Sequence, residues 1–394
     1  MKISILVPDL SNNCVGRAYI LAKVLQRKYD VEIVGPVFGR GIWEPVAEDK
    51  SIKYKSFKFS KTIISIFKIR GLCRYVDCDV IYAVKPLFNS FGIGILKKSK
   101  SNKKLPLVLD IDDWQEGLIN DYCYGSFLKY FKYFTKSLIF PFDIGSYWND
   151  ISGRKFLRFA DNVTVSGSFL QKKYGGAVVR HVRDTGFFNP ANFNKDLLRQ
   201  KYGIKEKDKI VMFFGTPRPH KGLEVLVEAM SLVNRDDIKL IIVGVDDRDR
   251  YCRNVVKKAK DKLTGKLEIF GLQPFKKVPE FLSMANIVVI PQEKSSSTVG
   301  QLPAKLFDAM AMAKPVIATQ VSDIPEVLNG CGWIIKPDDT EKLRRTIQYV
   351  IDNPGEAEKT GLNARKRCVE RYSMDAAEVN LLKIFEVFNK KRNY

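Results

Sequence analysis

The chain has 394 residues, too long for one ordinary domain and enough for two of about 150 to 200 residues each. Hydrophobic residues make up 45% and charged residues 28% of it, which excludes a mostly disordered, collagen-like or coiled-coil protein. Lys and Arg number 66 against 44 Asp and Glu, so the net charge of +22 predicts an anionic partner. No apolar run reaches the roughly 18 residues that cross a bilayer, and no secretory signal pattern is present, so we expect a cytoplasmic protein.

Cysteine and histidine usage excludes several kinds of site. The seven cysteines are scattered without a C-x-x-C spacing, which indicates reduced, mostly buried thiols and no disulfide framework. Only His181 and His220 are present, so a multi-histidine metal centre lacks ligands and a histidine-based triad has few candidate bases. We predict no resident metal or cofactor and little hydrolase chemistry.

Short apolar runs rich in β-branched residues alternate with amphipathic stretches, first in residues 1–180 and again after residue 209. This pattern predicts β-α-β units and parallel sheets. Helices are expected near residues 18–27 and directly after Gly222, and residues 340–389 are helical in pattern, with breaks at Pro354 and Ser373. The predicted strands are residues 3–7, 31–34, 80–83, 107–111 and 162–165 in the first half, and 210–214, 240–243, 267–270, 287–290 and 315–318 in the second.

The polar stretch 184–194, which contains Asn and Pro, reads as a linker between two lobes. We therefore predict an α/β protein with two Rossmann-like, doubly wound domains that face a cleft. Parallel sheets of this kind bind ligands beyond the carboxyl ends of their strands, so the ligand is expected in that cleft.

The run 213–222, F-F-G-T-P-R-P-H-K-G, lies between a buried strand and an amphipathic helix. A glycine at 215 lets the backbone approach a ligand, and Arg218 and Lys221 would neutralise a diphosphate at the helix start. The alternative is a proline-stiffened turn with two exposed cations.

The run 291–318 places a polar loop between a strand and a helix that begins near Pro303. Backbone N–H groups of about Val299 to Ala304 are expected to face an anion, with the helix dipole aligned. Asp308 is placed to accept hydrogen bonds from vicinal hydroxyls such as those of a ribose, with Lys305 one turn back. The alternative for Asp308 is an exposed helix acid paired with Lys305.

Together these two runs resemble the family 4 glycosyltransferases. Gly215, Lys221 and Gly222 match G-R-x4-K-G, with Thr216 where the arginine is expected and Arg218 as its substitute. Asp308 takes the place of the second glutamate of E-x7-E, and Gly300 that of the first, so no sugar contact is carried over to Gly300. The run Leu-Pro-Ala-Lys-Leu-Phe-Asp, which includes Leu302, Pro303 and Lys305, is similar to a subgroup with L-P-x-K-x-F-E/D.

The resemblance implies the GT-B fold, with domains at 1–185 for the acceptor and 195–370 for the nucleotide sugar, and a C-terminal helix in 371–394 that packs back on the first domain. It implies that Phe270 and Leu272 contact the nucleotide base. Asp112 occupies the place of a histidine that usually contacts the donor sugar. Gly16 and Arg17 are the best candidates for diphosphate or acceptor contacts.

The resemblance also implies a retaining, metal-independent transferase in which the departing phosphate oxygen takes the acceptor proton. The donor would be UDP-, GDP- or ADP-linked, and the acceptor a glycan or a lipid-linked hydroxyl, as in cell-surface polysaccharide or glycolipid synthesis. One rival is another GT-B enzyme, such as a nucleotide-sugar epimerase or a phosphorylase. A basic nucleic-acid-binding protein is the other rival, and it has no use for Lys221 and Asp308.

Two further features leave alternatives open. Asp110, Asp112 and Asp113 form a D-x-D pattern that could hold Mg²⁺, or in which Asp110 and Asp113 cap the next helix and order a loop. Residues 122–148 hold eleven aromatics interleaved with lysines, and residues 50–74 hold eight Lys or Arg and no acid. This mixture suits the inner face of an anionic membrane, and the alternative for 122–148 is a buried helical pair.

Overall fold

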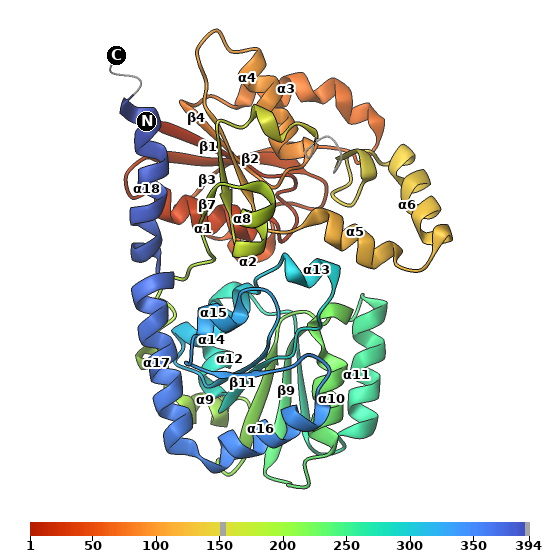
Figure 1. Ribbon diagram of the computed structural model, residues 1–394, viewed down its shortest axis with the longest axis vertical. Helices are drawn as coiled ribbons and strands as arrows, with labels where there is room; N and C mark the ends of the chain where they lie inside the picture. The colour runs from red at the N-terminus through yellow and green to blue at the C-terminus, as the bar shows by residue number, and fades with distance from the viewer. Residues whose placement is uncertain (150–154, 391–394) are drawn as a thin grey trace. The chain divides into compact units, whose positions relative to one another are not determined.

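The computed structural model describes residues 1–149 and 155–390. The chain divides into unit 1, Met1–His181 with Met374–Tyr394, and unit 2, Val182–Ser373. Figure 1 traces the two units in chain order by colour. The first boundary lies between His181 and Val182, and the second between Ser373 and Met374.

Unit 1 is built on a seven-stranded sheet in the order β3-β2-β1-β4-β5-β6-β7, in which every neighbouring pair is parallel. The five predicted strands are present within a few residues, while β3 and β7 were not predicted. The sequence of β3, KYKSFK, is half exposed and rich in lysine, as is common for an edge strand. The strands are β1 (Lys2–Leu6), β2 (Asp30–Val37), β3 (Lys53–Lys58), β4 (Val80–Val84), β5 (Leu107–Ile111), β6 (Asn162–Val165) and β7 (Ala177–Val178).

The C-terminal helix α18 (Met374–Lys390) belongs to unit 1 and packs against α1 (Val15–Leu25). Lys28 Nζ lies 2.8 Å from Glu386 Oε1, and the fully buried ring of Phe385 lies 5.2 Å from that of Tyr82. The other helices of unit 1 among the described residues are α2 (Glu44–Ala47), the 3-10 helix η1 (Ile63–Lys68), α3 (Ile69–Tyr75), the π-helix η2 (Phe88–Gly92), α4 (Ile93–Ser99), α5 (Gln115–Cys123), α6 (Phe127–Ile139), the 3-10 helix η3 (Leu157–Phe159) and α8 (Ser168–Tyr174).

Unit 2 contains a six-stranded parallel sheet in the order β10-β9-β8-β11-β12-β13. Its strands alternate side chains between two apolar cores, for example Met212 on one face and Val211 with Phe213 on the other. All five predicted strands are present; β13, three residues long, was missed. The strands are β8 (Lys209–Phe214), β9 (Ile238–Val245), β10 (Leu267–Gly271), β11 (Ile287–Ile290), β12 (Val316–Thr319) and β13 (Trp333–Ile335).

The helices of unit 2 cover both faces of this sheet. The predicted breaks at Pro354 and Ser373 are confirmed, since α17 begins at the first and ends just before the second. The helices are α9 (Lys195–Lys201), α10 (Leu223–Ser231), α11 (Arg250–Lys262), α12 (Val278–Met284), α13 (Ser296–Val299), α14 (Ala304–Ala311), α15 (Ile324–Leu328), α16 (Thr340–Asp352) and α17 (Pro354–Tyr372).

In each unit the strand order reverses at one point, between β1 and β4 in unit 1 and between β8 and β11 in unit 2. Loops that leave the carboxyl ends of such strand pairs diverge and leave room for a ligand. All candidate residues except Phe270 and Leu272 follow these strands or their neighbour β5. In each unit the candidate residues thus lie at the carboxyl ends of the strands, where such sheets bind ligands.

Candidate functional site

The loops after β8 and β11 touch at Gly222 in unit 2. This glycine has φ +65°, and a Cβ at this position would overlap the carbonyl oxygen of Pro291. Gly215, directly after β8, has φ +106° and open space on its Cβ side. Glycine is therefore required at 222 for contact between the loops and at 215 for the backbone turn.

Lys221 lies at the end of the first loop, before α10. Its Nζ donates a hydrogen bond to the carbonyl oxygen of Thr216 at 2.7 Å. Burial, with a further contribution from the charge of Arg218, lowers the pKa of Lys221 to about 8. The ammonium is thus held inside the loop by one neutral acceptor.

Lys305, in the first turn of α14, is the most unusual group of the site. Its Nζ is buried and has no hydrogen-bond partner within the described part of the chain. It lies 4.4 Å from the centre of the Phe213 ring, a cation–π contact. Burial and the nearby charge of Lys221 both lower the pKa of Lys305 well below that of an ordinary lysine. Two lysine amines that influence each other therefore lie in the segments that follow β8 and β11. A buried amine without a hydrogen-bond partner favours an anionic ligand, which would hold it in the charged form.

The backbone amides expected to face an anion are fewer than predicted. The unpredicted helix α13 uses the amide of Val299, which donates to Ser295, and the amides of Gly300 and Gln301, which donate to Thr298. Helix α14 begins at Ala304 as predicted, and Pro303 at its N-cap position provides no side-chain cap. In the first turn of α14, next to buried Leu302, the amide of Leu306 also donates within the chain, to Pro303, so Ala304 and Lys305 carry the remaining candidate amides.

Asp308 is buried and pairs with Arg183, whose Nε donates to Asp308 Oδ1. Arg183 also donates from Nη2 to the carbonyl oxygen of Ala304 at 3.0 Å, so it holds the start of α14 as well. The alternative of an exposed Asp308 paired with Lys305 is therefore wrong. No sequence signal identified Arg183 as the partner, because the pair spans 125 positions.

Three other predicted residues of unit 2 differ in whether their side chains are free to contact a ligand. Arg218 forms an ion pair with Asp249, which caps α11, so the guanidinium is not a free phosphate ligand. Phe270 packs its ring against Tyr202 and Phe281, with centroids 5.6 and 5.0 Å away, so it contributes to the core. Leu272 is 52% exposed, which leaves it as the accessible member of the predicted base-contacting pair.

In unit 1, Arg17 does not have the free guanidinium that a diphosphate contact requires. It is buried and donates two hydrogen bonds to Asp110, at 3.0 and 2.9 Å, and one each to the carbonyl oxygens of Val179 and Arg180. Asp110 also accepts from Thr164. The pair joins α1 to β5 and to the chain after β7, so Arg17 has a structural role. Gly16 precedes it at the start of α1, where a Cβ would lie 3.4 Å from the Trp43 ring.

Sequence reasoning missed Lys85, which follows β4. Its buried Nζ lies 2.7 Å from Asp112 Oδ1 and also bonds Asp113. The backbone of Lys85 has φ +69°, a conformation that non-glycine residues rarely adopt and that is common at functional sites. Two carboxylates raise the pKa of Lys85. Burial, with the neighbouring charges of Asp113 and Asp110, raises the pKa of Asp112 to about 6 although Lys85 lowers it.

These pairings show what the acids of the D-x-D run contact. The N-cap residue of α5 is Trp114, which provides no side-chain cap, so neither Asp110 nor Asp113 occupies that position. In residues 1–149 and 155–390 no group of three or more His, Cys, Asp or Glu side chains could hold a metal ion. The buried ammonium of Lys85 is the cation that pairs with Asp112 and Asp113.

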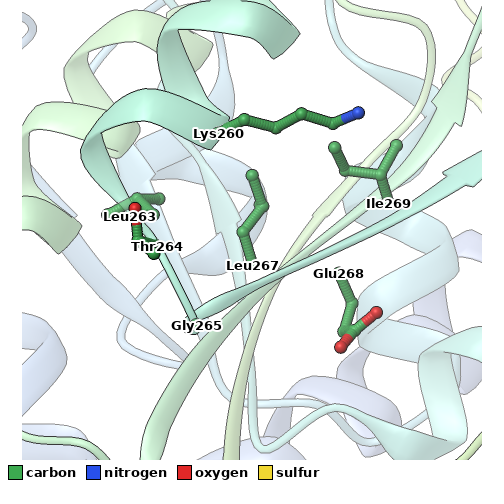
Figure 2. Close-up of a pocket in the computed structure, with 7 residues that line it drawn as sticks. All are labelled: Lys260, Leu263, Thr264, Gly265, Leu267, Glu268 and Ile269. Carbon is green, nitrogen blue, oxygen red and sulfur yellow. The ribbon is translucent and has the colours of Figure 1, made fainter.

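A separate hollow of about 390 Å³ lies in unit 2 between the last turn of α11 and the start of β10. Figure 2 shows its lining residues, among them Lys260, Leu263 and Glu268. It lies at the amino end of β10, opposite the edge at which parallel sheets bind ligands. It does not contain any of the candidate residues.

Comparison with known proteins finds relatives in sequence and in fold. Residues 194–367 match the family described as "Glycosyl transferases group 1". A curated relative, alpha-maltose-1-phosphate synthase of Mycolicibacterium smegmatis, is 28% identical over 220 residues, which cover 53% of this chain and 56% of the relative. The chain spans about half the length of the curated relatives it matches.

Solved structures match over almost the whole chain. Anabaena HepE in complex with UDP and glucose has a TM-score of 0.73 at 16% identity and covers 97% of this chain and 99% of its own. A glycosyltransferase from Rickettsia africae has a TM-score of 0.74 at 18% identity, with 99% of both chains covered. The chain therefore has the GT-B fold, and its residues 194–367 match the group 1 glycosyltransferases.

Proposed function

We propose that this chain is a glycosyltransferase that binds a nucleotide-diphosphate sugar at the carboxyl edge of the unit 2 sheet and transfers the sugar to an acceptor hydroxyl. The buried, unpartnered ammonium of Lys305 beside Lys221 is the observation that carries the proposal. A diphosphate would supply the acceptor oxygens that this ammonium lacks. The family match of residues 194–367 supports the same reading.

Stabilising the leaving group is the main chemical task in this reaction. In glycosyl transfer the sugar gains positive charge while the diphosphate gains negative charge, and fixed cations in a site of low dielectric lower that barrier. Lys305, Lys221 and the first-turn amides of α14 would perform this task without a metal. We propose retention of configuration, with the departing phosphate oxygen accepting the proton of the acceptor.

Asp308 and Leu272 would bind the nucleoside. Arg183 fixes one oxygen of the Asp308 carboxylate, and we propose that this carboxylate accepts hydrogen bonds from the ribose hydroxyls. The exposed side chain of Leu272, directly after β10, would contact the base. A uridine nucleotide is the first choice, because the structural neighbour HepE binds UDP.

We further propose that Asp112 of unit 1 contacts the donor sugar and that Lys85 positions it. The ion pair at 2.7 Å and the strained backbone of Lys85 support this role. The acceptor would be a glycan or a lipid-linked hydroxyl in cell-surface polysaccharide or glycolipid synthesis. The relevant variants are Asp112→Asn and Lys85→Met, tested for transfer with nucleotide binding measured in parallel.

The test is a panel of UDP-, GDP- and ADP-sugars, scored by thermal shift and by nucleotide release with and without candidate acceptors. The proposal predicts that one donor raises the melting temperature and that acceptor increases release of its nucleoside diphosphate. Lys305→Met should abolish both effects, while Lys257→Met, an exposed lysine of α11, should preserve them. Isomerisation of the donor without acceptor would indicate an epimerase, and a requirement for inorganic phosphate a phosphorylase; either result would overturn the proposal.

A further inference from the structure

Helix α6 of unit 1 presents an apolar face that the structure leaves uncovered. Phe127, Phe131 and Leu138 recur at positions i, i+4 and i+11 along one stripe of the helix, and Leu128 and Ile139 widen it. Phe127 is 80% and Leu128 69% exposed, and the other three are more than half exposed. The side that packs is the opposite one, where Tyr133 and Ser137 are buried. A buried helical pair over residues 122–148 is therefore not what forms here.

The lysines of α6 occupy the stripe next to this apolar face. Lys129, Lys132 and Lys136 are all exposed and recur at spacings of three and four residues. The first of them follows the N-cap residue Ser126 by one turn. An outward apolar stripe bordered by cations is the pattern of a helix that lies in a membrane interface.

The 3-10 helix η1 extends the same surface. Its side chains Ile63, Ile64, Ile66 and Phe67 are exposed, Phe67 by 84%. The two segments are fastened together through residue 61, because Lys61 Nζ lies 2.9 Å from Asp143, which also pairs with Lys136 at 3.3 Å. The amide of Phe142 donates to the carbonyl oxygen of Lys61 at 3.2 Å. We call these exposed side chains of η1 and α6, with Lys129, Lys132 and Lys136, the apolar–basic surface.

Charge identifies the occupant of the apolar–basic surface. Residues 50–74 around η1 contribute eight basic side chains and no acid, and the whole chain carries +22. Asp143, the acid beside α6, is already bonded to two lysines. A second copy would bring an identical lysine-bordered face, so the two would repel each other. Apolar side chains bordered by cations fit a surface with an acyl interior and anionic headgroups.

We propose that unit 1 docks on anionic lipid bilayers through the apolar–basic surface, with the side chains of α6 and η1 at the level of the headgroups and the lysines on anionic lipid. This goes beyond the proposed transfer reaction and does not depend on it. In the described part of the chain no helix is long and apolar enough to cross a bilayer. Docking is accordingly peripheral, reversible and sensitive to salt.

The test is co-sedimentation of the full chain with vesicles of phosphatidylcholine alone and of an equimolar mixture with phosphatidylglycerol. The wild-type protein should sediment with the mixed vesicles and much less with the neutral ones. Phe127→Ser with Phe131→Ser should lower the bound fraction at least about tenfold. The matched control, Leu232→Ser with Leu362→Ser, replaces leucines that are similarly exposed in unit 2 and should bind as wild type does.

The electrostatic part is tested separately. Lys129→Glu with Lys132→Glu should reduce binding more than Lys257→Glu with Lys366→Glu, which makes the same change of charge on exposed helices of unit 2. Far-UV circular dichroism and thermal unfolding, measured for every variant, show that the fold is intact. Equal loss in both charge variants, or no sedimentation with mixed vesicles at low salt, would overturn the proposal. So would a dimer in solution that the Phe127→Ser, Phe131→Ser variant dissociates.

Discussion

The ammonium group of Lys305 lies 4.4 Å from the centre of the ring of Phe213, a residue of β8 that is fully buried in one of the two apolar cores of unit 2. A cation–π contact partly stabilises the buried charge, but it satisfies none of its hydrogen-bond donors. Burying this group without hydrogen-bond acceptors therefore destabilises the unliganded fold. Binding of an anion would recover that cost, which is the physical reason to place the diphosphate here.

Lys305→Met should stabilise the free protein and weaken nucleotide binding. Methionine fills a similar volume without a buried charge, so we expect the free energy of unfolding to rise by about 1 to 3 kcal/mol. The affinity for UDP should fall about 100-fold because a charge-assisted contact is lost. Thermal unfolding and calorimetric titration measure the two effects, with Lys257→Met as the control for a change of net charge. Unchanged affinity would remove Lys305 from the site.

Nucleotide affinity should fall as the pH rises above 8. Burial lowers the pKa of Lys221 to about 8 in the free protein, and a bound diphosphate would raise it again. Above pH 8 the free protein has lost this proton while the complex keeps it, so binding takes up a proton and weakens by up to tenfold per pH unit. Titrations in buffers of different ionisation enthalpy measure the uptake.

The control for this pH dependence is Lys221→Arg, which keeps the charge at every accessible pH. It should make the profile between pH 8 and about 10 less steep, because Lys305, whose pKa is also lowered, is then the remaining amine of the site that takes up a proton on binding. A wild-type affinity that stays constant across this range would contradict the assignment of Lys221.

Lys85→Ala should destabilise unit 1 strongly. It would leave Asp112 and Asp113 side by side without their cation, and breaking a buried ion pair typically costs about 3 to 5 kcal/mol. The exposed Lys58→Ala, made as a control, should change stability by less than about 0.5 kcal/mol. Denaturant unfolding distinguishes the two, and a small effect of Lys85→Ala would show that solvent reaches the carboxylates.

Arg183 and Asp308 should show strong coupling in a double-mutant cycle. Arg183→Met leaves a buried carboxylate unpaired, and Asp308→Asn leaves a buried guanidinium without its opposite charge. We expect a coupling free energy of about 1 to 3 kcal/mol from unfolding measurements. In nucleotide binding, Arg183→Lys should retain more affinity than Asp308→Asn, because the carboxylate and not its partner would bind the ribose. The reverse order would contradict that role.

The sequence was most informative where one physical signal decides the structure. Buried parallel strands read as apolar, β-branched runs, so every central strand was predicted within a few residues. The strands that were missed, β3, β7 and β13, are short or lie at sheet edges, where half-exposed sequence loses that signal. Helix α13 was missed because its four residues, Ser-Ser-Thr-Val, read as a loop.

Long-range pairing explains the errors at the site. Arg17, Arg218 and Asp308 have the residue types that the proposed chemistry needs, but each is bonded to a partner between 31 and 125 positions away. Periodicity carries no information on such partners. The same limitation hid Lys85, because neither its positive φ nor its two carboxylate partners can be read from neighbouring residues.

The most direct measurement is a crystal structure of the protein with UDP bound. The account predicts that diphosphate oxygens lie within about 3 Å of Lys305 Nζ and Lys221 Nζ, at the first turn of α14 and beside the loop after β8. A nucleotide bound at another place, with the Lys305 ammonium still facing the Phe213 ring and bonded to nothing, would contradict it.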